Sequence, residues 1–441
     1  MILLCLLSAG LALGPAAAAV LTETPLELTL DKAIALGLEQ NLDIGLAQSR
    51  LAFFEAQRRQ AWGAGLPSIN LAGAYDRDIE RPSFFLAGQR IKVGMDNNMT
   101  GTASFQQYLF TGGMVSQGLK AARVGVEGGR AQVRAAKEDV ILAVKSFFYA
   151  VCLASETTTI QKDSLALAED HLKTIDERYR QGLDSDLVVL RQKVEVANAQ
   201  PALLAARNGH ELALTLLKDT LGLDVDAPMR VVGGLDGKNI KLVPYESLQS
   251  AALEHNPDFM AARKQYEQAD AVLNVQKGFR WPWLTAVGAY QWTSQSNADW
   301  PGTRERATSS SVGLRLNYPL FTGGQASAQV AQASAKRDTA RSAMDKAARG
   351  IKVNVKRQWL SVKEALERAQ SQESAISQAR RALEATEVRY RAGEASLLEQ
   401  NDATLALQRA RLQYVNALHD YQVALAALER AVGMPVEEIS K

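Results

Sequence analysis

The tetrapeptide Phe-Thr-Gly-Gly occurs twice in the chain, in "YLFTGGMVSQ" at 108–117 and in "PLFTGGQASA" at 319–328. Phe110 and Phe321 are therefore 211 positions apart. In both copies a strand-like run ends at the phenylalanine, two glycines provide a turn, and a helix-like segment follows. An internal duplication would repeat other motifs at the same spacing, whereas a coincidence would not.

The same spacing recurs along both halves of the chain. The motif "RYRQG" at 178–182 and the motif "RYRAG" at 389–393 are again 211 positions apart, as are Gly222 and Gly433. Nearer the start of each half the spacing becomes 215 positions, which relates Asn41 to Asn256, Pro67 to Pro282, Gly73 to Gly288 and Tyr75 to Tyr290. A constant spacing with one localised insertion indicates duplication, and it places a longer polar loop in the first half.

Each half predicts the same order of elements: a helical segment, two strands joined by a polar loop, and two long helices. The first repeat is predicted at 20–225, an inter-repeat linker at 226–244 and the second repeat at 245–441. Strands are expected at about 66–76 and 101–111 in the first repeat, and at about 282–293 and 309–321 in the second. Long helices are expected at about 113–180, 185–221, 324–391 and 396–432.

The long helices show the pattern of coiled coils. Apolar and small residues follow alternating steps of three and four from Val362 to Tyr390, and a segment of about 65 residues would be roughly 100 Å long. Gly182 and Gly393 are suited to end the first helix of each pair in a left-handed conformation. Ser396 can then cap the returning helix, with Glu399 completing a capping box. Each half is therefore predicted to form a long helical hairpin.

The strands alternate between apolar and polar residues. Leu284, Ala286, Gly288 and Tyr290 share one face of a predicted strand, which fits either the wall of an outer-membrane barrel or an amphipathic hairpin packed on the helices. In a barrel wall, Trp281, Trp283 and Trp292 would stand at the membrane interfaces. Four strands cannot close a barrel, because about eight is the smallest number found, and in lipid every sheet edge must be paired. If the strands span a membrane, several copies must share one barrel.

The beginning of the chain, "MILLCLLSAGLALGPAAAAV", contains no charged side chain and ends in small residues. This pattern predicts a secretory signal peptide at 1–19, so the chain is expected to leave the cytoplasm. The remaining composition argues against several classes of function. The net charge is +2, the four histidines lack the spacing of metal ligands, and no nucleophile or phosphate-binding motif occurs. We therefore expect no enzyme, no cofactor, no metal and no nucleic-acid partner.

Taken together in this order, "LPSINLAGAY", "FTGG", "RYRxG" followed by serine, and the final "ALERAVG" resemble the TolC-type outer-membrane efflux and secretion channels of Gram-negative bacteria. The resemblance implies a homotrimer with a twelve-stranded transmembrane β-barrel and a periplasmic tunnel of twelve helices. It also implies a belt at mid-height, formed by the linker and the termini. Such channels dock onto a periplasmic adaptor protein and an inner-membrane pump or ABC transporter, and they pass drugs or secreted proteins outward.

The resemblance also implies roles for residues at the helix tips. Glu399 and Asp402 match the acidic ring that narrows the periplasmic end of such channels, although capping and the helix dipole would equally account for both. Gly182, Leu183 and Gly393 match the turns that dock the adaptor. At two tip positions this chain departs from the pattern of the family's best-studied member, because Ala395 and Val188 stand in place of an arginine and its acidic partner. The alternative function is a periplasmic coiled-coil scaffold or adaptor without a pore.

Overall fold

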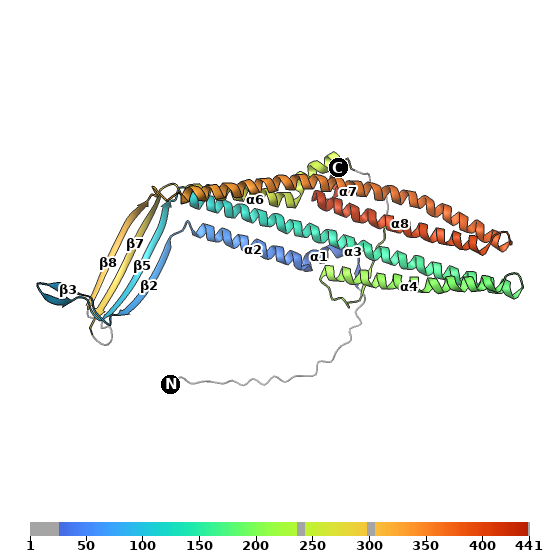
Figure 1. The fold of residues 1–441 in the computed structure, drawn as a ribbon, viewed down its shortest axis with the longest axis horizontal. Coiled ribbons are helices and arrows are strands. Elements are labelled where there is room, and N and C mark those ends of the chain that lie inside the picture. Colours follow the sequence, from blue (N-terminus) through green and yellow to red (C-terminus); the bar gives the residue numbers. More distant parts are fainter. Residues whose placement is uncertain (1–25, 236–242, 298–304, 440–441) are drawn as a thin grey trace, which may run out of the picture.

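The computed structural model describes residues 26–235, 243–297 and 305–439. The predicted signal peptide at 1–19 lies outside these residues. The protomer is strongly elongated, with a curved β-sheet at one end and the tips of two helical hairpins at the other (Figure 1). Helices that run along the long axis connect the two ends.

Four long helices form the two hairpins, and the two repeats match in length. α3 (Met114–Arg180) and α7 (Gln325–Arg391) have 67 residues each, and α4 (Asp186–Leu221) and α8 (Leu397–Val432) have 36 each. A helix of 67 residues is about 100 Å long. The turns at the tips contain Gly182 and Gly393, with φ of 74° and 79°, the left-handed conformation that glycine adopts without strain.

Shorter helices complete the half of the protomer nearer the sheet. α2 (Leu42–Gly63) packs on α3, and α6 (Pro257–Gly278) packs between α3 and α7. α2 lies in line with α4, so these two form one long edge of the protomer, while α7 runs along the other with α5 against its middle (Figure 1). The remaining helices are α1 (Leu30–Gln40), α5 (Tyr245–His255) and α9 (Val436–Ile439).

Four antiparallel strands form the large sheet in the order β2-β5-β7-β8. Their bounds are Ser68–Arg77 for β2, Asn97–Phe110 for β5, Trp283–Ser296 for β7 and Glu305–Asn317 for β8. β8 ends four residues before the expected position because Pro319 follows, and proline cannot donate to the ladder. β2 and β8 are the outer strands, so each leaves one edge unpaired among the described residues.

A second, smaller hairpin was not expected from the sequence. β3 (Ser83–Leu86) and β4 (Gln89–Lys92) pair in the loop between β2 and β5, where the first repeat is four residues longer. Ala87 and Gly88 form its turn, with φ of 50° and 86°. Positive φ at both central residues is the geometry of a two-residue hairpin turn. Such turns are signalled by Asn-Gly, Asp-Gly or Gly-Gly, so the Ala-Gly pair gave no sign of this hairpin.

The middle of the protomer holds the tertiary contacts that join the repeats. β1 (Leu26–Leu28) pairs in parallel with β6 (Met229–Val231), which brings the start of the described chain onto the predicted linker. Beside them, Val144 and Phe148 of α3 form a hydrophobic cluster with Leu217 of α4. A corresponding cluster in the second repeat joins α5, α7 and α8. By length and composition alone, α3 contains an 18-residue window apolar enough to cross a membrane, and 28% of that window is buried in the protomer. Val144 and Phe148 are among the apolar residues of α3 that this cluster buries.

Duplicated residues meet in this region in the same way in both repeats. Asn41 donates a hydrogen bond to the Thr220 carbonyl at 3.0 Å, and Asn256 donates to the Ala431 carbonyl at 2.9 Å. Each asparagine also accepts a backbone N–H of the helix that it caps, α2 or α6. The asparagine therefore joins the start of a short helix to the end of a long one.

Candidate functional site

The strand register divides the large sheet into an apolar and a polar face. Ile69 and Leu71 of β2, Tyr290 of β7, and Leu314 and Leu316 of β8 lie on one face and are all exposed. The opposite face carries Ser, Thr and Gln, for example at 102, 104, 106, 309 and 311. An exposed apolar face of strands 10 to 14 residues long is what the lipid-facing wall of a β-barrel requires.

The three predicted interface tryptophans differ in position. Trp292 lies in β7 on the apolar face, opposite Gly101 of β5. Trp281 follows the end of α6 and is 61% exposed. Trp283 is nine residues from Trp292 in an uninterrupted register, so it lies on the polar face, because side chains alternate along a strand. The structure thus places Trp283 and Trp292 on opposite faces of the sheet, and the alternation of side chains along a strand already predicts this difference.

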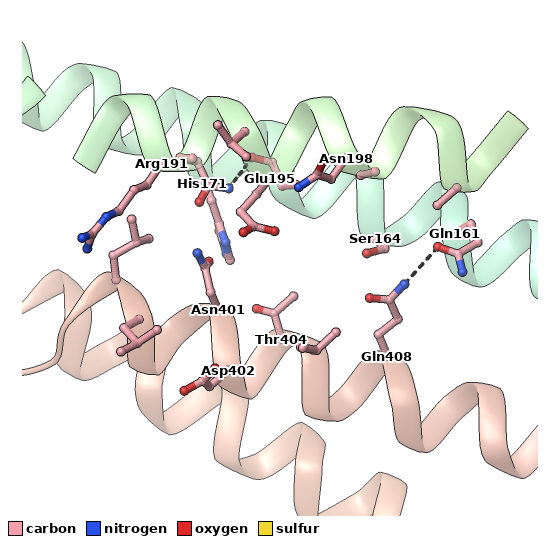
Figure 2. A pocket seen from close by; sticks show the side chains of 18 residues that line it. Gln161, Ser164, His171, Arg191, Glu195, Asn198, Asn401, Asp402, Thr404 and Gln408 are labelled. Carbon is pink, nitrogen blue, oxygen red and sulfur yellow. Dashed lines mark hydrogen bonds between the residues drawn. The ribbon is translucent and has the colours of Figure 1, made fainter. Parts of the chain in front are cut away.

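At the other end of the protomer, α3, α4 and α8 surround a cavity of about 660 Å³. Asp402 and Asn401 line it from α8, while Arg191, Glu195 and Asn198 line it from α4 (Figure 2). The cavity lies in the groove where α4 and α8 both flank α3. Asp402 therefore lies in this groove, together with other charged and polar side chains.

Glu399 has different surroundings from Asp402, although the two are three residues apart in α8. The Ser396 hydroxyl accepts the Glu399 backbone N–H at 3.3 Å and lies 3.3 Å from the Glu399 carboxylate. Glu399 therefore takes part in capping the helix, yet its side chain remains exposed and is not among the residues that line the cavity. Because the capping contact leaves the Glu399 side chain exposed, Glu399 can both cap α8 and take part in the predicted acidic ring.

The docking residues predicted at the tips are all exposed. A Cβ atom added at Gly182 or Gly393 would meet nothing within 4 Å, so the left-handed backbone is the only local demand for glycine. Leu183, beside Gly182, is 63% exposed at the extreme end of the protomer. An apolar side chain in this position is available to a binding partner.

The two departures from the family pattern are filled by apolar packing. Val188 and Ala395 contact a small cluster formed by Ile175, Val189 and Tyr390, which joins the two hairpins just above their tips. At its rim, Arg178 forms an ion pair with Asp184 at 2.8 Å, and its guanidinium lies 5.3 Å from the centre of the Tyr390 ring. The hairpins are thus held together within the protomer by contacts other than those implied by the resemblance.

The sequence did not indicate the buried polar cluster around His171. His171 of α3 lies between α7 and α8, with its Nε2 atom 3.1 Å from the Gln400 amide nitrogen and 3.7 Å from the Glu387 carboxylate. Burial lowers the pKa of His171, and the neighbouring Glu387 opposes this effect. A neutral ring can accept a hydrogen bond from Gln400. One histidine in a helical pattern gave no sign that three long helices would meet at it.

The comparison with protein families decides the identity of this arrangement. The model of the outer membrane efflux protein family matches residues 33–223 and 248–434, one segment in each repeat. The chain belongs to the outer membrane efflux protein family. Its members are channels, so the chain is a non-enzymatic outer-membrane efflux channel with a periplasmic extension, of the kind that serves tripartite efflux or type I secretion systems.

Individual relatives agree with this membership. The outer membrane protein TolC of Vibrio cholerae is 24% identical over 403 residues, covering 90% of this chain and 88% of the relative. The alkaline protease secretion protein AprF of Pseudomonas aeruginosa is 22% identical, covering 76% of this chain and 69% of the relative. The first of these relatives is named as an outer membrane protein and the second as a protease secretion protein.

Solved structures support the fold of this family member. The outer membrane protein VceC from Vibrio cholerae superposes with a TM-score of 0.78 at 20% identity, covering 92% of this chain and 96% of that one. The Campylobacter jejuni CmeC outer membrane channel gives a TM-score of 0.79 at 18% identity, covering 97% and 95%. The fold class predicted from the sequence is confirmed, and the family implies a homotrimer with efflux-system partners.

Proposed function

We propose that three copies of this chain form a passive exit duct with one shared barrel of twelve strands and a tunnel of twelve helices. The unpaired edges of β2 and β8 carry this proposal. In lipid, an unpaired edge leaves backbone N–H and C=O groups without water or partners, at a cost of several kcal/mol each. Pairing β2 of one copy with β8 of the next removes both edges and gives a closed wall with its apolar face outward.

The long edges of the helical layer support the same assembly. α2 exposes Leu42, Leu46 and Phe53, at 86%, 55% and 60%. On the opposite edge, α7 exposes Val353 and Leu360, at 64% and 49%. Along α4 the exposed apolar residues continue at Leu187, Leu190, Val194, Leu204, Leu212 and Leu216. Stripes spaced by about one heptad suit coiled-coil packing, so α7 of one copy would cover α2 and α4 of the next.

Asp402 and Glu399 are proposed to form the selective narrowing at the periplasmic end. Asp402 lines the cavity between α4 and α8, and in the proposed ring this side of the helical layer faces the axis. Three copies would place six carboxylates near the axis, and a ring of carboxylates favours cations. The exposed tips with Gly182, Leu183 and Gly393 are proposed to dock a periplasmic adaptor, which links the duct to an inner-membrane pump or ABC transporter.

Single-channel recording in a planar lipid bilayer tests the proposed duct. We expect the detergent-extracted trimer to conduct with a preference for cations. The Glu399→Ala/Asp402→Ala variant should conduct more and lose much of that preference. Unchanged selectivity in this variant would refute the proposed acidic ring. A trimer that never conducts, even with both carboxylates removed, would favour the scaffold function over the duct.

A further inference from the structure

A cluster of three arginines lies close to the junction between the helices and the large sheet. Arg58 and Arg59 in the last turns of α2 and Arg123 near the start of α3 line a cavity of about 330 Å³. Trp62 and Leu119 complete its lining, and Trp62 is 61% exposed. The cavity therefore combines three guanidinium groups with an apolar wall, and no carboxylate lines it.

None of the three arginines is neutralised by a carboxylate within the described part of the chain, although they share one cavity. Seventeen ion pairs occur among the described residues, and none of them involves Arg58, Arg59 or Arg123. The acidic residue nearest to Arg123 on the next turn of α3, Glu127, is already bound to Lys264 of α6 at 2.8 Å. Three cations gathered around one cavity repel one another unless an anion joins them. Glu55, one turn before Arg58 and Arg59 on α2, forms no ion pair with any described residue and does not line the cavity. The partner of the three cations is therefore expected to be an anion from outside the protomer.

The position of the cavity along the protomer points to the membrane surface. α2 ends at Gly63, five residues after Arg58, and α3 begins at Met114, nine residues before Arg123. At about 1.5 Å per residue, the cluster lies roughly 8–14 Å from the helix ends that join the sheet. Side chains on a helix lean toward its N-terminus, so Arg123 leans toward the sheet. If the sheet spans the hydrocarbon layer, the three arginines lie at the depth of the phosphate groups of the inner leaflet.

The cavity lies on the side of α3 opposite the groove that holds Asp402, which is the outer side in the proposed trimer. A Cβ added at Gly125 would meet both Gln268 of α6 and Phe54 of α2, so Gly125 marks the side on which the two neighbours converge on α3. Arg123 is two residues away, about 200° around the helix, and faces the opposite side. The convergent side continues into the groove of the Asp402 cavity, since α2 is in line with α4 and α6 with α8 (Figure 1).

We propose that Arg58, Arg59 and Arg123 bind the phosphate headgroup of an anionic phospholipid in the inner leaflet of the outer membrane, with Trp62 beside the lipid at the interface. Guanidinium groups bind phosphate oxygens through paired hydrogen bonds, and tryptophan is enriched at the membrane–water boundary. The inference rests on the proposed trimer, which makes this surface the outer one. A carboxylate of the neighbouring copy is not the favoured anion. That copy would pack on the apolar stripe at Phe53, which lies on another side of α2.

Native mass spectrometry of the full-length protein, with phosphatidylglycerol added to the detergent, tests the site. The Arg58→Gln/Arg59→Gln/Arg123→Gln variant should retain this lipid on the order of 100-fold less well, since each basic residue near an anionic surface contributes about fivefold. The matched control removes three exposed arginines nearer the hairpin tips, Arg207→Gln/Arg380→Gln/Arg409→Gln, and should retain lipid like the wild type. Should the triple variant fail to assemble, each single variant is expected to lose about fivefold.

Several results would overturn the inference. These are equal lipid retention by both triple variants, equal retention of zwitterionic phosphatidylcholine, or equally tight binding of inorganic phosphate alone. Dissociation of only the first variant into monomers in lipid-free detergent would show that the arginines hold a neighbouring copy instead. Measuring the conductance of the same triple variant distinguishes failure of this inference from failure of the proposed duct. Loss of lipid with wild-type conductance supports the inference, whereas retained lipid with normal conductance refutes the lipid site alone.

Discussion

His171 is buried, whereas the other three histidines of the chain are partly exposed. It joins the two hairpins, because its ring lies between Gln400 of α8 and Glu387 of α7. Asp170 and Arg391 also act on its charge, in opposite directions, but burial dominates and the pKa is lowered from 6.5. The ring is therefore neutral in the folded protein over a pH range in which it is charged in the unfolded chain.

The consequence is a pH dependence of stability near the hairpin tips. Below about pH 6.5 the unfolded chain binds a proton that the folded ring binds less well, so folding stability is lost as pH falls through this value toward the lowered pKa. One group can contribute at most about 1.4 kcal/mol per pH unit. We expect His171→Gln to remove this part of the loss. Thermal unfolding of both proteins at pH 8 and pH 5.5 measures it, with His210→Gln as the partly exposed control.

The glycines that end the long helices are required for different reasons. Gly393 at a tip needs only a left-handed backbone, with φ of 79°. Gly433 at the end of α8 has φ of 85°, and an added Cβ would lie 2.7 Å from the His255 carbonyl oxygen and 2.9 Å from Asn256 Cα. The backbone of the α5–α6 turn therefore closes directly over Gly433, next to the Asn256 hydrogen bond.

Alanine substitution should separate these two demands. Gly393→Ala is expected to cost about 1–2 kcal/mol, the penalty for a left-handed alanine. Gly433→Ala adds a clash with backbone atoms, which brings the expected loss to about 3 kcal/mol or more. Denaturant unfolding of the two variants measures the difference. Equal losses at the two positions would contradict the close backbone approach at Gly433.

For the whole molecule, the decisive feature is what a single protomer leaves uncovered. The sheet exposes one apolar face and two free edges, and the helical layer exposes apolar stripes along both long edges. Leucine, valine and phenylalanine side chains that cover one another would each contribute about 1.5–3 kcal/mol if fully buried. In the proposed trimer the protomer is thus an open segment of a ring, and neighbouring copies cover the apolar surface that it exposes.

A charge placed in an edge stripe should therefore weaken assembly. Phe53→Glu would bury an unpaired carboxylate against α7 of the next copy, so we expect the trimer in mild detergent to dissociate at a concentration at least tenfold higher. Ala52→Glu adds the same charge on the same helix but away from the stripe, and should leave the trimer intact. Light scattering coupled to size-exclusion chromatography compares the two. Identical behaviour of both variants would argue that this stripe is not an interface.

The sequence by itself determined the duplication, the lengths of the four long helices and the alternation of the strands. These follow from local rules: the heptad period, glycines that permit φ above zero, and the two-residue period of a strand. The two-residue period of a strand also predicts that Trp283 lies on the polar face. Only the tertiary structure decided that His171 lies among three helices and that Gly433 lies beneath the α5–α6 turn. It also gathered Arg58, Arg59 and Arg123 around one cavity. Such contacts join residues 60 to more than 200 positions apart, and their geometry depends on how helices cross and rotate, which no local pattern encodes.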